Sequence, residues 1–190
     1  MKKCYIFGTF NPIHNSHLNI ADYLVNNGFD KAVFVPAYRP PHKNFDENQA
    51  KKRLEMVKLA VKNNTKFEVD DIEFKRKTPS YTYDTIKQLY KGERINFAIG
   101  TDAFEKIESW YEIDKLKNML FFHIFKREKD FDYKKFDYLK AKGFLFKFMD
   151  MPFEDISSTG IRKKIENGED FSTLVDKNVV EYIYEHEIFK

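Results

Sequence analysis

Two histidines stand three residues apart in a short segment between an apolar run and a helical pattern. His14 and His17 lie at the end of the segment Gly8-Thr9-Phe10-Asn11-Pro12-Ile13-His14-Asn15-Ser16-His17. At this spacing both imidazoles can face the same side of a helix's first turn. A helix start also offers free backbone N–H groups and the positive end of the dipole, which suits an anion. The pattern favours a phosphate site, although two capping or surface histidines remain the alternative at this point.

A second cluster lies near the far end of the chain. The segment Ile156-Ser157-Ser158-Thr159-Gly160-Ile161-Arg162 starts a predicted helix with three consecutive hydroxyls and an arginine one turn later. A structural N-cap would explain one hydroxyl but not all three together with Arg162. Hydroxyls, free N–H groups and a guanidinium at one helix start suit a di- or triphosphate. Together, the two clusters match the needs of a nucleoside triphosphate.

The elements that must position these residues alternate between short apolar runs and helical patterns, which predicts an α/β fold. We expect a doubly wound, Rossmann-like parallel sheet with helices on both faces and a C-terminal helical segment. The predicted strands are 4–7, 32–35, 96–99, 120–125 and 144–148, with an extended segment at 67–74. The predicted helices are 18–25, 48–61, 83–90, 158–167 and 172–187, with Gly28 ending the first. Ligands of such sheets bind after the carboxyl ends of strands, so the segments 8–17, 36–43, 100–102 and 152–162 are the candidates.

Composition narrows the class of protein. The 190 residues predict one domain, with 152–190 as its C-terminal helical part. The 33 basic and 30 acidic residues are interspersed, which argues against a nucleic-acid surface, and the run Lys51-Lys52-Arg53 is interpreted as a solvated helix face. No apolar run reaches the ~18 residues of a membrane span. One cysteine, Cys4, excludes an internal disulfide and favours the reducing cytoplasm.

These motifs resemble the nucleotidyltransferase α/β-phosphodiesterase superfamily, which is marked by (H/T)-x-G-H after the first strand and I-S-S-T-x-[IV]-R near the end. Within it, the chain is similar to the bacterial nicotinate-nucleotide adenylyltransferases of NAD biosynthesis. The further matching segments are Val35-Pro36-Ala37, Pro40-Pro41-His42-Lys43, Ser80-Tyr81-Thr82-Tyr83-Asp84-Thr85, Gly100-Thr101-Asp102 and Trp110. The chain departs from the family pattern at Phe7, which precedes a single glycine, at Asn11, where aspartate is usual, and at Ser16, where glycine is usual.

The resemblance implies transfer of the AMP part of ATP to nicotinate mononucleotide, giving deamido-NAD and pyrophosphate. His14 and His17 would donate to the α-phosphate, with at least one imidazole cationic when nucleotide is bound. The expected ATP-binding residues are Gly8, Thr9, Phe10, Lys43, Gly100, Asp102, Ser158, Thr159 and Arg162. Tyr83, Thr85 and Trp110 would hold the pyridine nucleotide.

Further expectations concern partners and alternatives. Mg²⁺ would be bound mainly through the ATP phosphates, without a dedicated protein metal site. The sequence leaves homo-oligomer formation open. The alternatives are a related adenylyltransferase that uses nicotinamide mononucleotide or phosphopantetheine, and a nucleotide-binding regulator without turnover.

Overall fold

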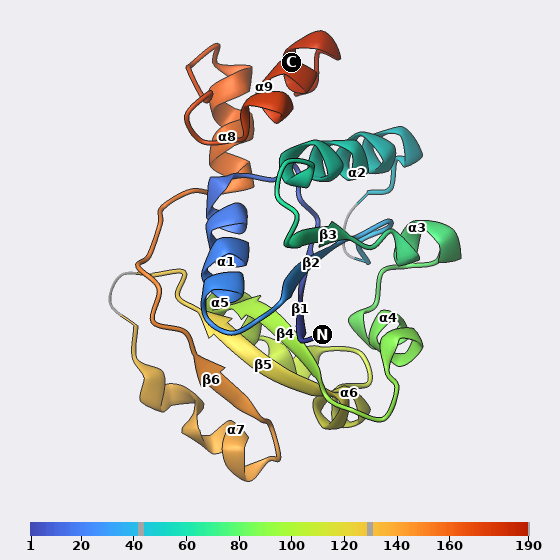
Figure 1. The fold of residues 1–190 in the computed structure, drawn as a ribbon, viewed down its shortest axis with the longest axis vertical. Helices are drawn as coiled ribbons and strands as arrows, with labels where there is room; N and C mark the ends of the chain where they lie inside the picture. Colours follow the sequence, from blue (N-terminus) through green and yellow to red (C-terminus); the bar gives the residue numbers. More distant parts are fainter. Residues whose placement is uncertain (42–43, 129–130, 190) are drawn as a thin grey trace.

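A computed structural model of the chain describes residues 1–41, 44–128 and 131–189. Its centre is one six-stranded sheet in the order β3-β2-β1-β4-β5-β6, and every neighbouring pair is parallel (Figure 1). The strands are β1 (Lys3–Gly8), β2 (Lys31–Pro36), β3 (Phe67–Val69), β4 (Ile95–Gly100), β5 (Leu120–Phe125) and β6 (Phe146–Phe148). The predicted doubly wound sheet is confirmed.

The strand order reverses between β1 and β4, which pair with each other at the centre of the sheet. Gly8 ends β1 opposite Pro36 of β2, and Gly100 ends β4 opposite Phe125 of β5. The carboxyl ends of four strands therefore meet at one edge of the sheet. This edge is the topological switch point, where open α/β sheets bind their ligands.

Successive side chains along the strands point to opposite faces of the sheet, so an apolar layer forms on each face. Cys4 and Ile6 of β1 point toward one layer, whereas Phe97 and Ile99 of β4 point toward the other. The first layer lies under α1 (Asn15–Asn26) and α2 (Glu47–Val61), with α8 (Ser158–Glu166) and α9 (Lys177–Glu185) packed beyond them. The second layer lies under α4 (Thr82–Leu89), α5 (Thr101–Phe104), α6 (Ile113–Met119) and α7 (Asp137–Ala141). Both faces of the sheet are covered, as predicted.

The structure corrects several predicted boundaries. The segment 67–74 is not extended throughout, because β3 ends at Val69 and the short helix α3 (Ile72–Arg76) follows. Asp70 Oδ1 accepts the Ile72 N–H at 3.1 Å, and Lys77 ends the helix in the left-handed region. The last helix begins at Lys177 rather than at residue 172, because the Asp176 side chain accepts from Asn178 N–H. The sixth strand is likewise shorter than predicted and covers only Phe146–Phe148.

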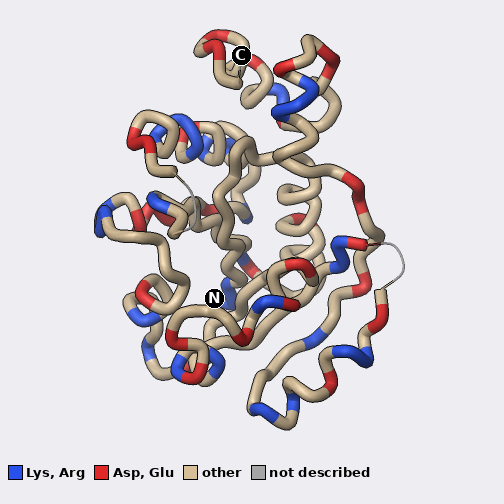
Figure 2. The backbone as a smooth tube through the Cα atoms, turned by 180° about the vertical axis from the view of Figure 1, so that it is seen from behind, with Lys and Arg blue, Asp and Glu red and all other residues tan. Residues whose placement is uncertain are grey.

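Charged residues of both signs are distributed over the helices and loops. Figure 2 shows Lys and Arg interspersed with Asp and Glu along most of the backbone. Within residues 1–41, 44–128 and 131–189, no helix combines the length and apolar character needed to cross a membrane.

Candidate active site

The start of α8 lies directly against the loop that follows β1. Ser158 Oγ donates to the Pro12 carbonyl at 2.9 Å, across 146 residues of sequence. Arg162 Nη1 donates to the Asn11 carbonyl at 2.8 Å. Ser157 is the N-cap, since its Oγ accepts from the Gly160 N–H at 3.1 Å. The predicted convergence of the two clusters is confirmed.

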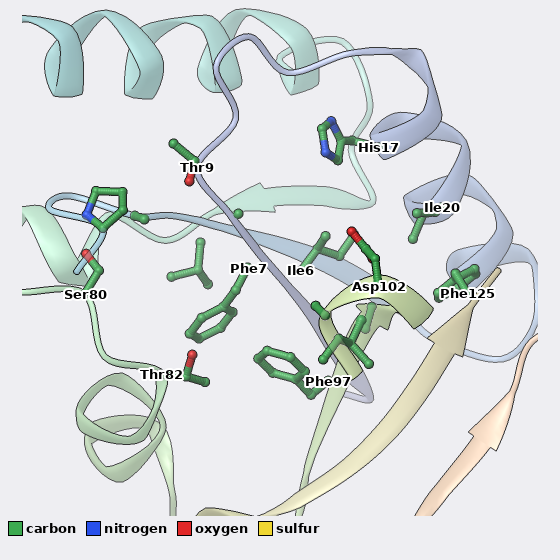
Figure 3. Close-up of a pocket in the computed structure, with 18 of the residues that line it drawn as sticks. Ile6, Phe7, Thr9, His17, Ile20, Ser80, Thr82, Phe97, Asp102 and Phe125 are labelled. Atoms are coloured by element: carbon green, nitrogen blue, oxygen red, sulfur yellow. The ribbon is translucent and has the colours of Figure 1, made fainter. Parts of the chain in front are cut away.

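Two cavities open at the carboxyl edge of the sheet. The main cavity, about 330 Å³, is lined by Gly8, Thr9 and His17 from the β1 side and by Gly100, Asp102 and Trp110 from the β4 side. Figure 3 shows Thr9, His17 and Asp102 around this cavity. A second cavity of about 320 Å³ is lined by His14 and Ser158. Asp102 and Arg127 line both cavities, so the two spaces adjoin.

The two imidazoles of the first cluster stack on each other. Their ring centroids lie 3.7 Å apart with an interplanar angle of 29°. The His14 backbone N–H donates to His17 Nδ1 at 3.3 Å, which assigns the ring proton of neutral His17 to Nε2. His14 is 2% exposed, and its buried Nδ1 has no hydrogen-bond partner among the described residues. The first turn of α1 thus holds two imidazoles at the cavity walls in a fixed orientation.

Burial and a nearby cation keep both imidazoles neutral. Burial, and then the charge of Arg127, lower the pKa of His14 to about 3. The pKa of His17 lies well below its ordinary value because of burial, His14 and Arg127. Without nucleotide, both rings are therefore neutral N–H donors at pH 7, and the cationic imidazole expected with bound nucleotide stays a prediction.

Arg127 is a candidate site residue that the sequence analysis missed. It follows β5 at the same edge of the sheet, and its backbone N–H donates to Thr101 Oγ1 at 3.0 Å. Its Nη1 donates to Ser16 Oγ at 3.3 Å, so the serine found where the family usually has glycine helps to orient this cation. The signal that could have found it is the pair of basic residues, Lys126 and Arg127, that follows the end of a predicted parallel strand.

The two predicted site glycines allow close approach of the chain. A Cβ on Gly8 would lie 2.8 Å from the Phe10 ring, and one on Gly100 would overlap Asp102 Oδ1 and lie 2.9 Å from Arg127 Nε. Phe10, also predicted to bind ATP, has a side chain that is 3% exposed and packs edge-on against Phe34 at 5.8 Å, so this side chain anchors the loop in the core. Its contact with ATP stays a prediction.

Trp110 separates the main cavity from a third one of about 480 Å³, and its ring lies edge-on to Phe97 at 6.1 Å. Thr82, at the start of α4, lines both spaces with it. Tyr83 and Thr85, predicted to hold the pyridine nucleotide, do not line these two cavities, and their contact with substrate stays a prediction. Tyr83 packs against Tyr111, with ring centroids 6.0 Å apart. Thr85 is fully buried.

The remaining predicted ATP-binding residues are Lys43, Thr159 and Asp102. Lys43 lies outside the described residues, although Pro40 and Pro41 before it line the main cavity. Thr159 Oγ1 accepts from Arg162 Nη2 at 3.2 Å, so the last hydroxyl of the cluster orients the arginine. Asp102 lies in the first turn of α5, two residues beyond the N-cap Gly100, and it lines both cavities.

Comparison with known proteins agrees with this geometry. Residues 5–164 match the family model described as cytidylyltransferase-like. Two relatives, from Clostridium botulinum strain Okra and Clostridium acetobutylicum, are each named probable nicotinate-nucleotide adenylyltransferase. They are 38% and 37% identical to the chain, with full coverage of both sequences in each case.

Solved structures share the fold. A Plasmodium falciparum nicotinic acid mononucleotide adenylyltransferase complexed with NaAD has a TM-score of 0.79 at 24% identity, covering 100% of this chain and 98% of that one. The structure of a protein from Vibrio parahaemolyticus, described as a putative nicotinate-nucleotide adenylyltransferase, has a TM-score of 0.66 at 20% identity. The match covers 100% of this chain and 96% of that one. By its full-length match to the curated relatives, the chain belongs to the cytidylyltransferase-like family and, within it, to the nicotinate-nucleotide adenylyltransferases.

Proposed function

We propose that this chain transfers the AMP part of ATP to nicotinate mononucleotide, giving deamido-NAD and pyrophosphate. The observation that carries the proposal is the contact of the α8 hydroxyl–arginine cluster with the loop of the stacked histidines, at the switch point of the sheet. The full-length similarity to relatives named for this activity supports it.

The two adjoining cavities suggest where each substrate lies. The triphosphate would occupy the second cavity, where His14, Arg127 and Ser158 meet. The mononucleotide would occupy the main cavity, with its pyridine ring against Trp110. The α-phosphate would then lie near His17, between the two nucleotides.

The chemistry asks little of the protein beyond positioning and charge. The attacking oxygen belongs to a phosphate anion, so no general base is required. It forms a bond to the α-phosphorus while the bond to the pyrophosphate oxygen breaks and pyrophosphate leaves with the electron pair. The N–H groups of His14 and His17 and the guanidinium of Arg127 would stabilise the negative charge that develops.

Selection of the acid over the amide would come from the start of α4. The first N–H groups of this helix, near Thr82, have no partner within the helix and lie beside Trp110 at the cavity. Such donors favour a carboxylate over a neutral amide. Each ~1.4 kcal/mol of this preference corresponds to tenfold discrimination.

Mg²⁺ would be bound mainly by phosphate oxygens and water, and it would offset charge on the triphosphate. The carboxylates of Asp102 and Glu154 line the cavity proposed for the triphosphate, and they are oxygen ligands of the kind that Mg²⁺ prefers.

We also place the reaction in the cytoplasm, because the sole cysteine, Cys4, is a free and buried thiol.

Pyrophosphate release with three acceptors tests the proposal. ATP is supplied with nicotinate mononucleotide, nicotinamide mononucleotide or phosphopantetheine, and we expect the highest kcat/KM with the first. Turnover with phosphopantetheine alone would assign the chain to another activity of the superfamily. Binding of ATP without turnover on any acceptor would favour a regulator.

A further inference from the structure

Arg53 is buried although it belongs to a run of basic residues on α2. The sequence analysis interpreted Lys51, Lys52 and Arg53 as one solvated face, which is wrong for Arg53 because it is only 5% exposed. Burial lowers the pKa of Arg53 to about 10 and the charge of Glu73 raises it, so the guanidinium is cationic at neutral pH. A buried charge of this kind requires several hydrogen bonds to offset its desolvation.

The guanidinium binds three backbone carbonyls from two different loops. Nη1 donates to the Thr9 carbonyl at 2.7 Å and to the Ala37 carbonyl at 2.6 Å. Nη2 donates to the Tyr38 carbonyl at 3.1 Å. Thr9 follows β1, Ala37 follows β2, and both line the main cavity. The Ala37 N–H also donates to the Gly8 carbonyl at 2.9 Å, so the guanidinium adds to a backbone bond that already joins these two neighbouring loops.

Glu73 holds the same peptide segment from the other side. It lies on α3, is 2% exposed and lines the main cavity. Its Oε2 accepts the Tyr38 N–H at 3.3 Å, and its Oε1 accepts the Thr85 hydroxyl at 2.7 Å. Because Thr85 belongs to α4, the carboxylate connects the β2 loop to the helix that carries Thr82.

We infer that Arg53 and Glu73 are positioning residues for adenylyl transfer, which set the distance between the Thr9 loop, the β2 loop and the start of α4. The inference rests on the proposed function. The three donor–carbonyl bonds use three of the five guanidinium N–H groups of Arg53, and the residue is only 5% exposed, so we assign it to holding the loops. A displacement of about 1 Å between reacting groups lowers a rate by on the order of 10²-fold.

Steady-state kinetics of matched variants test this role. Arg53→Lys keeps the positive charge but loses the planar guanidinium that donates to three carbonyls. Glu73→Gln keeps one acceptor oxygen and replaces the other with an NH₂ group. Lys51→Met, which removes an exposed cation from the same turn of α2, is the control. We expect kcat/KM to fall on the order of 10²-fold in R53K and E73Q, with a lower kcat and higher KM for both substrates, and to stay unchanged in K51M.

The double variant adds a further check. Because both residues hold the Tyr38 peptide, the losses of R53K and E73Q should combine to less than their product in R53K/E73Q. All rates are measured below the melting temperature of each variant and per folded molecule, so that lost folding is not counted as lost activity.

Four results would overturn the inference. Lower melting temperatures with unchanged kcat and KM would make the pair purely structural. A rise in the KM for ATP alone, larger in Arg53→Met than in R53K, would make Arg53 a direct phosphate ligand. A wild-type protein without pyrophosphate release would overturn the proposed function and this inference together, whereas an active wild type with unaffected R53K and E73Q would refute only the inference.

Discussion

His123 should make the stability of the fold depend on pH. The side chain lies on β5, is 3% exposed and has its Nε2 3.0 Å from Asn96 Oδ1. Its Nδ1 is buried without a partner among the described residues, and the Phe29 ring stands edge-on to it at 5.0 Å. Burial, and then the charges of Lys147 and Lys2, lower the pKa of His123 to about 4.

The sign of the effect follows from this lowered pKa. Between the unfolded value of about 6.5 and the folded value, the unfolded chain binds a proton that the folded chain does not. The free energy of unfolding contributed by His123 is therefore fully present above pH 6.5 and is lost as the pH falls toward 4. The slope within this window is about 1.4 kcal/mol per pH unit, and the whole contribution is on the order of 3 kcal/mol. His14 and His17 change stability in the same direction.

Urea unfolding between pH 7.5 and 4.5 measures this contribution. For His123→Gln, we expect the free energy of unfolding to depend less steeply on pH than in the wild type, by about 1.4 kcal/mol per unit between pH 6 and 4.5. Ile124→Val, a neighbouring core variant without a titrating group, should cost about 1 kcal/mol at every pH and keep the wild-type slope. An H123Q protein with the wild-type slope would refute the assigned burial and charge effects.

Three further predictions concern the site and its support. His17→Ala should lower kcat by about 10²–10³-fold while the protein still melts cooperatively; unchanged pyrophosphate release would remove the residue from the mechanism. Trp110→Ala should raise the KM for nicotinate mononucleotide about tenfold and leave the KM for ATP unchanged, with Trp110→Phe close to the wild type, so equal effects on both substrates would argue against ring stacking. Thr85→Val should lower the free energy of unfolding by about 1–3 kcal/mol, because Glu73 Oε1 loses its donor, and unchanged urea unfolding would contradict that role.

The sequence was most informative where one pattern dominates a segment. The apolar runs that became β1, β2, β4 and β5 contain few polar residues, so they were readily identified as strands. The clusters at His14 and Ser158 could be proposed as phosphate sites because their residue types and their places at helix starts indicate the same kind of ligand. The topology of the sheet then brings them together.

Residues whose role depends on distant contacts could not be assigned from local patterns. Arg53 looks like its exposed neighbours until the carbonyls of two other loops are placed around it. Thr85 is the last residue of the Ser80-Tyr81-Thr82-Tyr83-Asp84-Thr85 segment that was predicted to hold substrate. In the structure its hydroxyl donates to Glu73. The short helix α3 lacks the length for a clear periodic signal, and its capping residues decide its limits.

The contact between α8 and the β1 loop has a consequence for protein synthesis. The histidine pair leaves the ribosome long before Ser158 and Arg162, since 146 and 151 residues separate the bonded partners. A nascent chain that ends before α8 can form most of the sheet but lacks the groups proposed to hold the outer phosphates. If α8 holds the outer phosphates as proposed, tight ATP binding should therefore require a chain synthesised at least through Arg162.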